Sequence, residues 1–201
     1  MRRSKTLTKI IAGSLVIACL TIPQIAWAKQ DEVKSFHLGQ KQERKEHKLQ
    51  KKQENQQFRS TLKGLTPQEK TNAVLEHRET QYGENKAFHQ KLHDENMAFL
   101  NQKLANNKRL TDEQKTELVN FTNNQFQESS SFRDQQHAEN IAYLQQVAND
   151  PNMTQAQRKE ALKQYFQKQK AENENFRTQQ KTENKEFKQQ LKPHPQTQPQ
   201  V

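Results

Sequence analysis

Two histidines, His89 and His93, lie four residues apart in the middle of the chain, next to Asp94. On an α-helix this spacing places both imidazoles on one face, one turn apart, as in a two-ligand metal site. A zinc site needs at least three protein ligands, and the spacing of the other residues identifies no third ligand. Histidines on a helix surface or in a packing seam are therefore the simpler interpretation, with His89 and His93 as the candidate metal pair.

The other reactive side chains show no catalytic arrangement. Carboxylates are numerous, but almost all lie near Lys or Arg at helical spacing, as solvated ion pairs do. No Ser, Lys or His stands in a recognisable nucleophile pattern, and no glycine-rich loop could hold a phosphate. We therefore expect no enzyme, no catalytic residue and no cofactor.

A repeated Glu-Asn-x-x-aromatic pattern, which we call the ladder, contains most of the Phe and Tyr residues. It occurs at Glu84-Asn85…Phe88 and again eleven residues later at Glu95-Asn96…Phe99. The pair recurs twice more at intervals of about 44 residues, and a weaker version lies between residues 32 and 58. Seven ladder residues are candidates for a binding role: Phe58, Phe88, Phe99, Phe132, Tyr143, Phe176 and Phe187.

The ladder has two interpretations. Single rings separated by amides form a narrow polar seam, in which Asn fixes the register between packed helices. Alternatively, some rings stay accessible and form an adaptable surface that binds unfolded client proteins. The seven ladder aromatics are client-binding residues only under the second interpretation.

Helix is the only secondary structure that fits the composition. The chain has 4 Gly in 201 residues and is rich in Glu, Gln, Lys, Leu and Ala. Capping boxes of the form Thr-x-x-Glu/Gln begin helices at Thr66, Thr111 and Thr154, and Gly64 closes the helix before the first of them. The sequence predicts four helices, over residues 30–63, 67–106, 111–149 and 154–191.

The predicted fold is all-α, with four long antiparallel helices. The last three are tandem repeats of about 44 residues, each with an internal period of eleven residues. Short loops make consecutive helices antiparallel neighbours. An eleven-residue period gives about 3.67 residues per turn, which keeps the ladder on one helix face. Residues 193–201 contain several Pro and Gln residues, and we expect this tail to be disordered.

Residues 1–28 have the features of a secretory signal. A basic leader precedes an apolar run over 10–22, Pro23 interrupts the run, and small residues precede a cleavage site after Ala28. The run is short for a membrane span. We expect a periplasmic or secreted protein, and a lipoprotein anchored at Cys19, the single cysteine, is the alternative.

Removal of the signal leaves a chain with basic ends. Four basic residues lie in the signal, so the formal net charge falls from +10 to +6. Residues 29–63 carry +5 and residues 150–192 carry +4, whereas 67–106 and 107–149 carry −1 and −2. Such ends can attract acidic proteins, an anionic polymer or a membrane surface. Lysines that only solvate the helices are the simpler interpretation, and an extracytoplasmic location argues against nucleic acid.

The expected core is thin. Leu, Ile, Val and Phe are 29 of the 173 residues that follow the signal, below the level of about 20% at which disorder becomes a concern. The regular pattern still favours a folded chain. We therefore expect a marginal bundle or one completed by formation of a homodimer.

The capping boxes resemble the Leu-Thr-x-x-Gln motif of the Spy/CpxP family of periplasmic stress proteins. Residues 110–114, Leu-Thr-Asp-Glu-Gln, match the motif fully. Residues 65–69 have Glu in place of Gln, and residues 153–157 have Met in place of Leu. Members of that family are ATP-independent chaperones with a basic concave face and apolar patches, so the resemblance implies the same activity here. The tandem repeats and the ladder depart from the family pattern.

Three functional hypotheses follow. The first is an ATP-independent chaperone or anti-aggregation stress protein that binds unfolded clients through basic and aromatic helix surfaces. The second is a structural helical scaffold that joins proteins of the cell envelope. The third is a stress protein that binds a polyanion or a metal.

Overall fold

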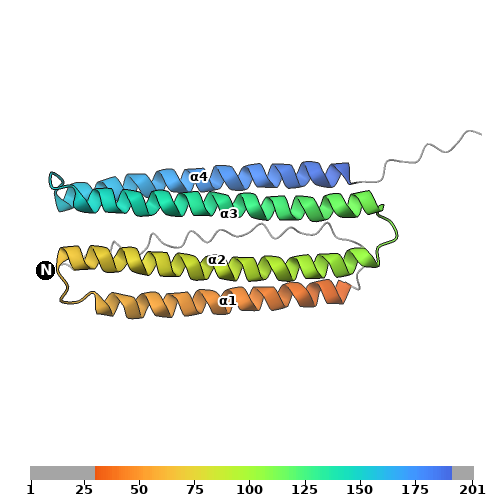
Figure 1. The fold of residues 1–201 in the computed structure, drawn as a ribbon, viewed down its shortest axis with the longest axis horizontal. Helices are drawn as coiled ribbons and strands as arrows, with labels where there is room; N and C mark the ends of the chain where they lie inside the picture. The colour runs from red at the N-terminus through yellow and green to blue at the C-terminus, as the bar shows by residue number, and fades with distance from the viewer. Residues whose placement is uncertain (1–29, 192–201) are drawn as a thin grey trace, which may run out of the picture. The chain divides into compact units, whose positions relative to one another are not determined.

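Four long α-helices make up residues 30–191, the part of the chain that the computed structural model describes (Figure 1). They are α1 (Gln30–Thr61), α2 (Pro67–Ala105), α3 (Asp112–Asn149) and α4 (Gln155–Gln190). These residues contain no strand, so the predicted all-α class with four helices is confirmed. Each helix begins and ends within two residues of its predicted boundary. The 44-residue repeat stays a prediction.

The predicted signal over residues 1–28, with Cys19 and the cleavage site after Ala28, lies outside the described residues, as does the tail over 193–201. None of the helices within residues 30–191 is long and apolar enough to cross a membrane.

Capping boxes begin α2, α3 and α4, as predicted. At the start of α2, the Thr66 hydroxyl accepts a hydrogen bond from the Glu69 amide at 3.3 Å, and the Thr66 amide donates to the Glu69 carboxylate at 2.7 Å. Two backbone donors without helical partners are thereby satisfied. The same reciprocal bonds join Thr111 to Gln114 and Thr154 to Gln157.

The connections between helices are fixed by local side chains. Gly64 has a φ of 83°, in the left-handed region that glycine tolerates best, and it lies between α1 and α2 as predicted. Between α2 and α3, the buried side chain of Asn107 accepts hydrogen bonds from the amides of Arg109 and Leu110, at 2.8 and 3.1 Å. These short turns hold α1 close to α2 and α2 close to α3.

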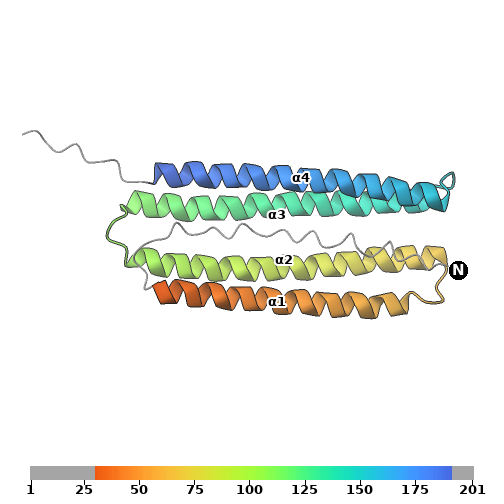
Figure 2. The ribbon, with the colours of Figure 1, turned by 180° about the vertical axis from the view of Figure 1, so that it is seen from behind.

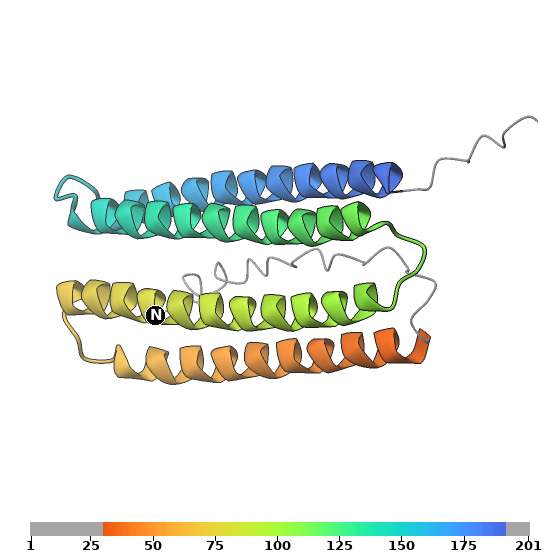
Figure 3. The same cartoon turned by 45° about the vertical axis from the view of Figure 1, so that its right-hand side comes forward.

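The described residues divide into two compact units. Helices α1, α2 and α3, with the start of α4 up to Arg158, form one unit, and α4 from Lys159 belongs to the other. In the first, which we call the three-helix unit, α2 lies between α1 and α3 (Figures 1 and 2). The view turned by 45° shows the same order of these three helices (Figure 3).

The core of the three-helix unit combines leucines with buried polar side chains. Leu92, Leu100, Leu104 and Leu118 are each 4% exposed or less. The buried polar residues of this unit are Gln40, Asn107, Thr122, Gln125, Ser129 and Gln136. Buried amides need partners, and the Gln40 side chain donates to the backbone carbonyl of Leu92 across the α1–α2 interface, at 3.3 Å. The thin core expected from composition is therefore supplemented by polar contacts.

Replacement of Leu92 by Ala should lower the free energy of unfolding by about 2–5 kcal/mol, because the deletion leaves a cavity at a side chain only 1% exposed. The measurement is urea denaturation, with unfolding monitored by circular dichroism. The matched control is Leu49→Ala at a side chain 54% exposed, which should change stability by less than about 0.5 kcal/mol. Equal losses in the two variants would contradict this description of the core.

Candidate functional site

Rings from α1 and α2 stack in pairs along the interface between these helices. The pairs are Phe36–Phe99, His47–Phe88 and Phe58–His77, with centroid distances of 4.1, 3.9 and 3.8 Å and interplanar angles of 1°, 7° and 10°. Residue numbers rise by eleven on α1 and fall by eleven on α2. The two helices are thus antiparallel and keep one register along the whole interface.

The α2–α3 interface repeats this arrangement on a second face of α2. Tyr82 stacks on His137 at 3.8 Å and 5°, and His93 stacks on Phe126 at 3.9 Å and 6°. Tyr82 and His93 are again eleven residues apart, as are Phe126 and His137. The middle helix, α2, therefore carries two parallel rows of stacked rings, one toward each neighbour. We call each such row a ladder as well, and each ring in it a rung.

Each histidine in these stacks also donates a hydrogen bond to a polar side chain on the helix whose ring it stacks on. The polar side chain lies three residues before the stacked ring in the sequence. For example, His47 stacks on Phe88 and donates from Nε2 to the Asn85 side-chain oxygen at 2.7 Å. We call this arrangement a histidine clasp. The other three clasps are His77 on Asn55 and Phe58, His93 on Asn123 and Phe126, and His137 on Glu79 and Tyr82, with bonds of 3.0, 3.0 and 2.9 Å.

The clasp explains the spacing of the ladder pattern. Residues three apart on a helix lie one turn apart on one face. A side-chain amide and a ring at this spacing can therefore contact the same imidazole, one by a hydrogen bond and the other by stacking. An Asn side-chain oxygen accepts only from a nitrogen that carries hydrogen, so the bond selects the tautomer protonated at Nε2. This geometry agrees with the interpretation of Asn as a residue that fixes register.

The glutamates of the ladder pattern form ion pairs beside the stacks. Glu54 on α1 pairs with Lys51 at 2.9 Å and accepts a hydrogen bond from Gln81 of α2 at 2.6 Å. Its bond from Lys51 is the main reason that the pKa of the Glu54 carboxyl falls to about 2. Two ion pairs cross from α1 to α2 and join Glu43 to Lys91 and Glu32 to Lys103. The acidic side chains of α1 that belong to the ladder are thus directed toward α2.

The seven client-binding candidates are all half-buried. Phe58, Phe88 and Phe99 stack on rings of the neighbouring helix. Phe132 and Tyr143 lie on α3, and Phe176 and Phe187 lie on α4, at the same eleven-residue spacing. By contrast, the exposed large hydrophobic residues of the described chain are Leu38 and Leu49, at 55% and 54%.

The two candidate metal ligands have different environments. His93 belongs to a clasp, in which its ring stacks on Phe126. At His89, burial is the main cause that lowers the pKa to about 4, and repulsion from the Arg133 guanidinium adds to it. Across residues 30–191, no group of three or more His, Cys, Asp or Glu is placed to hold a metal ion.

The Glu-Asn-x-x-aromatic pattern does not include every ring with this spacing. His77, Phe121 and Tyr165 lie eleven residues before Phe88, Phe132 and Phe176, but Glu-Asn does not precede them. The second ladder of α2 was missed as well. A simple signal could have found it, since Tyr82 and His93 are followed after 44 residues by Phe126 and His137.

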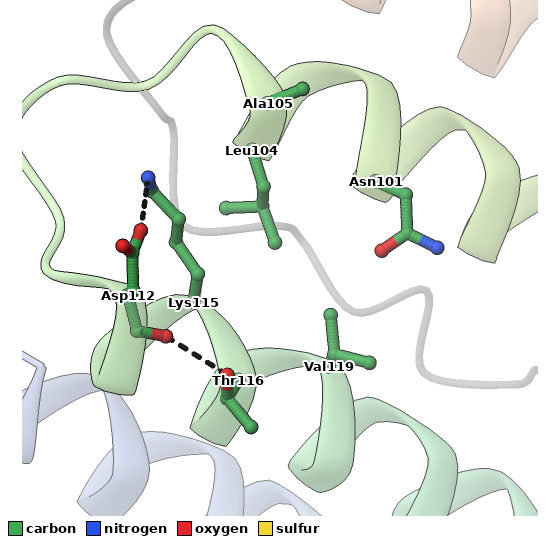
Figure 4. Close-up of a pocket in the computed structure, with 7 residues that line it drawn as sticks. All are labelled: Asn101, Leu104, Ala105, Asp112, Lys115, Thr116 and Val119. Carbon is green, nitrogen blue, oxygen red and sulfur yellow. Dashed lines mark hydrogen bonds and ion pairs between the residues drawn. The ribbon is translucent and has the colours of Figure 1, made fainter.

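A hollow of about 360 Å³ lies beside the turn between α2 and α3 (Figure 4). Its lining residues are Asn101, Leu104, Ala105, Asp112, Lys115, Thr116 and Val119. Lys115 pairs with Asp112 at 2.8 Å, and the Thr116 hydroxyl donates to the Asp112 carbonyl at 2.9 Å. Lys115 and Thr116 therefore both bond to Asp112, and these three residues form no pair of nucleophile and base.

No protein-family model matches this chain, and neither a curated protein nor a solved structure matches it.

The stack between His47 and Phe88 should contribute a measurable coupling energy. In a double-mutant cycle with His47→Leu and Phe88→Leu, we expect a coupling of about 1 kcal/mol, from the stack and the bond to Asn85. The measurement is urea denaturation of the four proteins. The control cycle pairs His47→Leu with Phe58→Leu, one rung away, where the effects should add to within about 0.5 kcal/mol. Coupling as large in the control would contradict the clasp.

Acidification below about pH 6.5 should weaken the fold through histidines whose pKa values are lowered in the folded chain. Burial is the main cause of lowered pKa values at His77, His89 and His93. The unfolded chain takes up these protons near pH 6.5, whereas folded His89 does so only near pH 4. Stability is therefore lost as the pH falls from 6.5 toward 4, by about 2 kcal/mol at pH 5 from His89 alone.

Denaturation curves at pH 7 and pH 5 test this dependence. The His89→Gln variant should lose about 2 kcal/mol less than the original protein over this interval. Glu54→Gln is the control, because the Glu54 carboxyl with a pKa of about 2 contributes stability that is lost only below pH 4.5. Identical pH dependence in the original protein and His89→Gln would show that His89 is not responsible.

Proposed function

We propose that the protein is a non-enzymatic helical scaffold that joins protein components of the cell envelope, outside the cytoplasm. The observation that carries this proposal is the pairing of ladder rings between helices. Phe58, Phe88 and Phe99, the ladder candidates on α1 and α2, stack on neighbouring rings at 3.8 to 4.1 Å. Rings held in this way serve helix packing, which is the role that a scaffold requires of them.

The regularity of the contacts supports the same function. Eleven residues of helix rise by about 16 Å, so the α1–α2 interface repeats one ring pair at that interval. Ion pairs that cross between the helices reinforce it, such as Lys91 with Glu43 and Lys103 with Glu32. A helix pair fixed in register at several points presents its outer surfaces at constant spacing, which suits the binding of other extended proteins.

An ATP-independent chaperone of the periplasm is the second candidate. The observation that favours it is the exposure of Leu38 and Leu49 among lysines on α1, at 55% and 54%. A basic surface with apolar side chains can capture acidic unfolded clients. The resemblance of residues 110–114 to the Spy/CpxP motif points the same way. Polyanion binding would need only the lysines, and metal binding lacks a ligand cluster in residues 30–191.

An aggregation assay separates the two candidates. Residues 29–201 are mixed at equimolar ratio with a client enzyme that unfolds on heating, at low salt, and light scattering is followed. A scaffold should leave the scattering within about a factor of two of the client alone, whereas a chaperone should suppress it and lose this effect at high salt. Strong suppression that falls in Phe88→Leu would overturn the scaffold proposal.

A second experiment tests the scaffold directly. Chemical crosslinking in envelope preparations should give one or a few discrete adducts of fixed stoichiometry. The Phe88→Leu/Phe99→Leu variant, which removes two stacks, should reduce their yield by loosening the α1–α2 interface. A continuous smear of adducts would indicate unfolded clients and would contradict the scaffold.

A further inference from the structure

The outer face of α1, formed by Leu38, Lys41, Lys45, Leu49 and Lys52, is exposed at each of these residues. Within the three-helix unit, α1 packs against α2 alone. Leu38 and Leu49 lie eleven residues apart, as do Lys41 and Lys52. This face therefore repeats with the same period as the ladders that join the helices.

The second interface of α2 shows what such a face does in this fold. On a helix with an eleven-residue period, a position five residues after a rung points in the same direction as one six residues before it. Tyr82 and His93 lie six residues before and five after the rung Phe88, and they stack on rings of α3. The equivalent positions on α1 are five residues after Phe36 and His47, and they hold Lys41 and Lys52.

The two exposed leucines also have equivalents in that interface. Leu38 and Leu49 each lie two residues after a ring of the α1 ladder. The same position is Glu79 on α2, which accepts from His137, and Asp134 on α3, which pairs with Lys86 at 2.8 Å. On α2 this position contacts α3, and on α3 it contacts α2. On α1 it therefore forms the edge at which another helix could be added.

Charge determines what kind of helix this edge accepts. The α1 glutamates that belong to the ladder pattern pair with residues at the α1–α2 interface. Lys41, Lys45 and Lys52 are exposed and take part in no ion pair among the described residues. A second copy of this chain that docked through the same face would bring the same lysines opposite one another and would be repelled. An anionic polymer would neutralise the lysines but would leave the leucines uncovered.

We propose that the outer face of α1 is a docking surface for an acidic amphipathic helix of another protein. The partner helix lies along α1 as α3 lies along α2, with acidic side chains opposite Lys41 and Lys52 and apolar side chains over Leu38 and Leu49. Its acidic and apolar residues recur every eleven residues, about 16 Å along the axis. This inference rests on the proposed scaffold function and names the surface and the partner class that the function would use.

A designed peptide tests the surface. The probe is a fluorescein-labelled helical peptide of three eleven-residue repeats, with Glu and Leu spaced to meet the lysines and leucines of α1. Binding to residues 29–201 is followed by fluorescence anisotropy at low and high salt. A second peptide with the same composition in scrambled order is the specificity control, and inorganic polyphosphate is the competitor that represents an anionic polymer.

Three variants separate the contributions. Lys41→Glu/Lys52→Glu should weaken binding of the repeat peptide by about tenfold or more, and Leu38→Gln/Leu49→Gln by about threefold or more. The matched control, Lys181→Glu/Lys185→Glu, makes the same charge change at exposed residues of α4 and should stay within about twofold of the original protein. All six positions are exposed, and circular dichroism verifies that each variant is folded.

The outcomes are distinct. Binding of the repeat peptide with these losses, and little binding of the scrambled peptide, would support the docking surface. Equal binding of both peptides, or loss with the lysine variant but not with the leucine variant, would overturn it in favour of an anionic-polymer surface. No binding of the repeat peptide would also overturn it. Discrete crosslinked adducts that persist in Lys41→Glu/Lys52→Glu would locate the scaffold's partner elsewhere, so failure of this inference can be told from failure of the scaffold proposal.

Discussion

The three-helix unit depends on an imidazole held between a ring and a polar side chain of the neighbouring helix. Parallel stacking at 3.8 to 3.9 Å fixes the distance between the helices, and the bond from Nε2 to Asn or Glu fixes their axial position. A leucine seam supplies attraction but tolerates small shifts along the helix axis. A clasp does not tolerate such a shift, because a displacement of one residue moves both the ring and the polar partner away from the histidine. Register is therefore specified by polar geometry as well as by apolar burial.

This device suits a chain with few large apolar residues. Aromatic rings bury a large area per residue, so one ring pair in each eleven residues can replace several leucines. Buried glutamines such as Gln125 and Gln136 fill positions that an ordinary bundle would give to leucine. The consequence is sensitivity to pH, since burial disfavours the protonated forms of His77, His89 and His93. His77 and His93 thus take part in both helix packing and the acid response.

The sequence was sufficient for the helices because their signals are local. Each capping box is complete within four residues, and the scarcity of glycine leaves no competing structure. The ladder was found for the same reason. The pairing of His47 with Phe88 could not be predicted, since it depends on the antiparallel register, and neither the loop length nor the eleven-residue period alone selects which rungs meet. Charge counting likewise located a basic segment at 29–63 but not the division of α1 into an acidic inner edge and a lysine-rich outer face.

Nuclear Overhauser spectroscopy on protein with labelled histidine and aromatic rings tests the clasp most directly. We expect cross-peaks between His47 and Phe88, His77 and Phe58, and His93 and Phe126, with imidazole protons shifted upfield by the stacked rings. Imidazole protons at the positions of an unfolded peptide, with no cross-peaks to these rings, would contradict it.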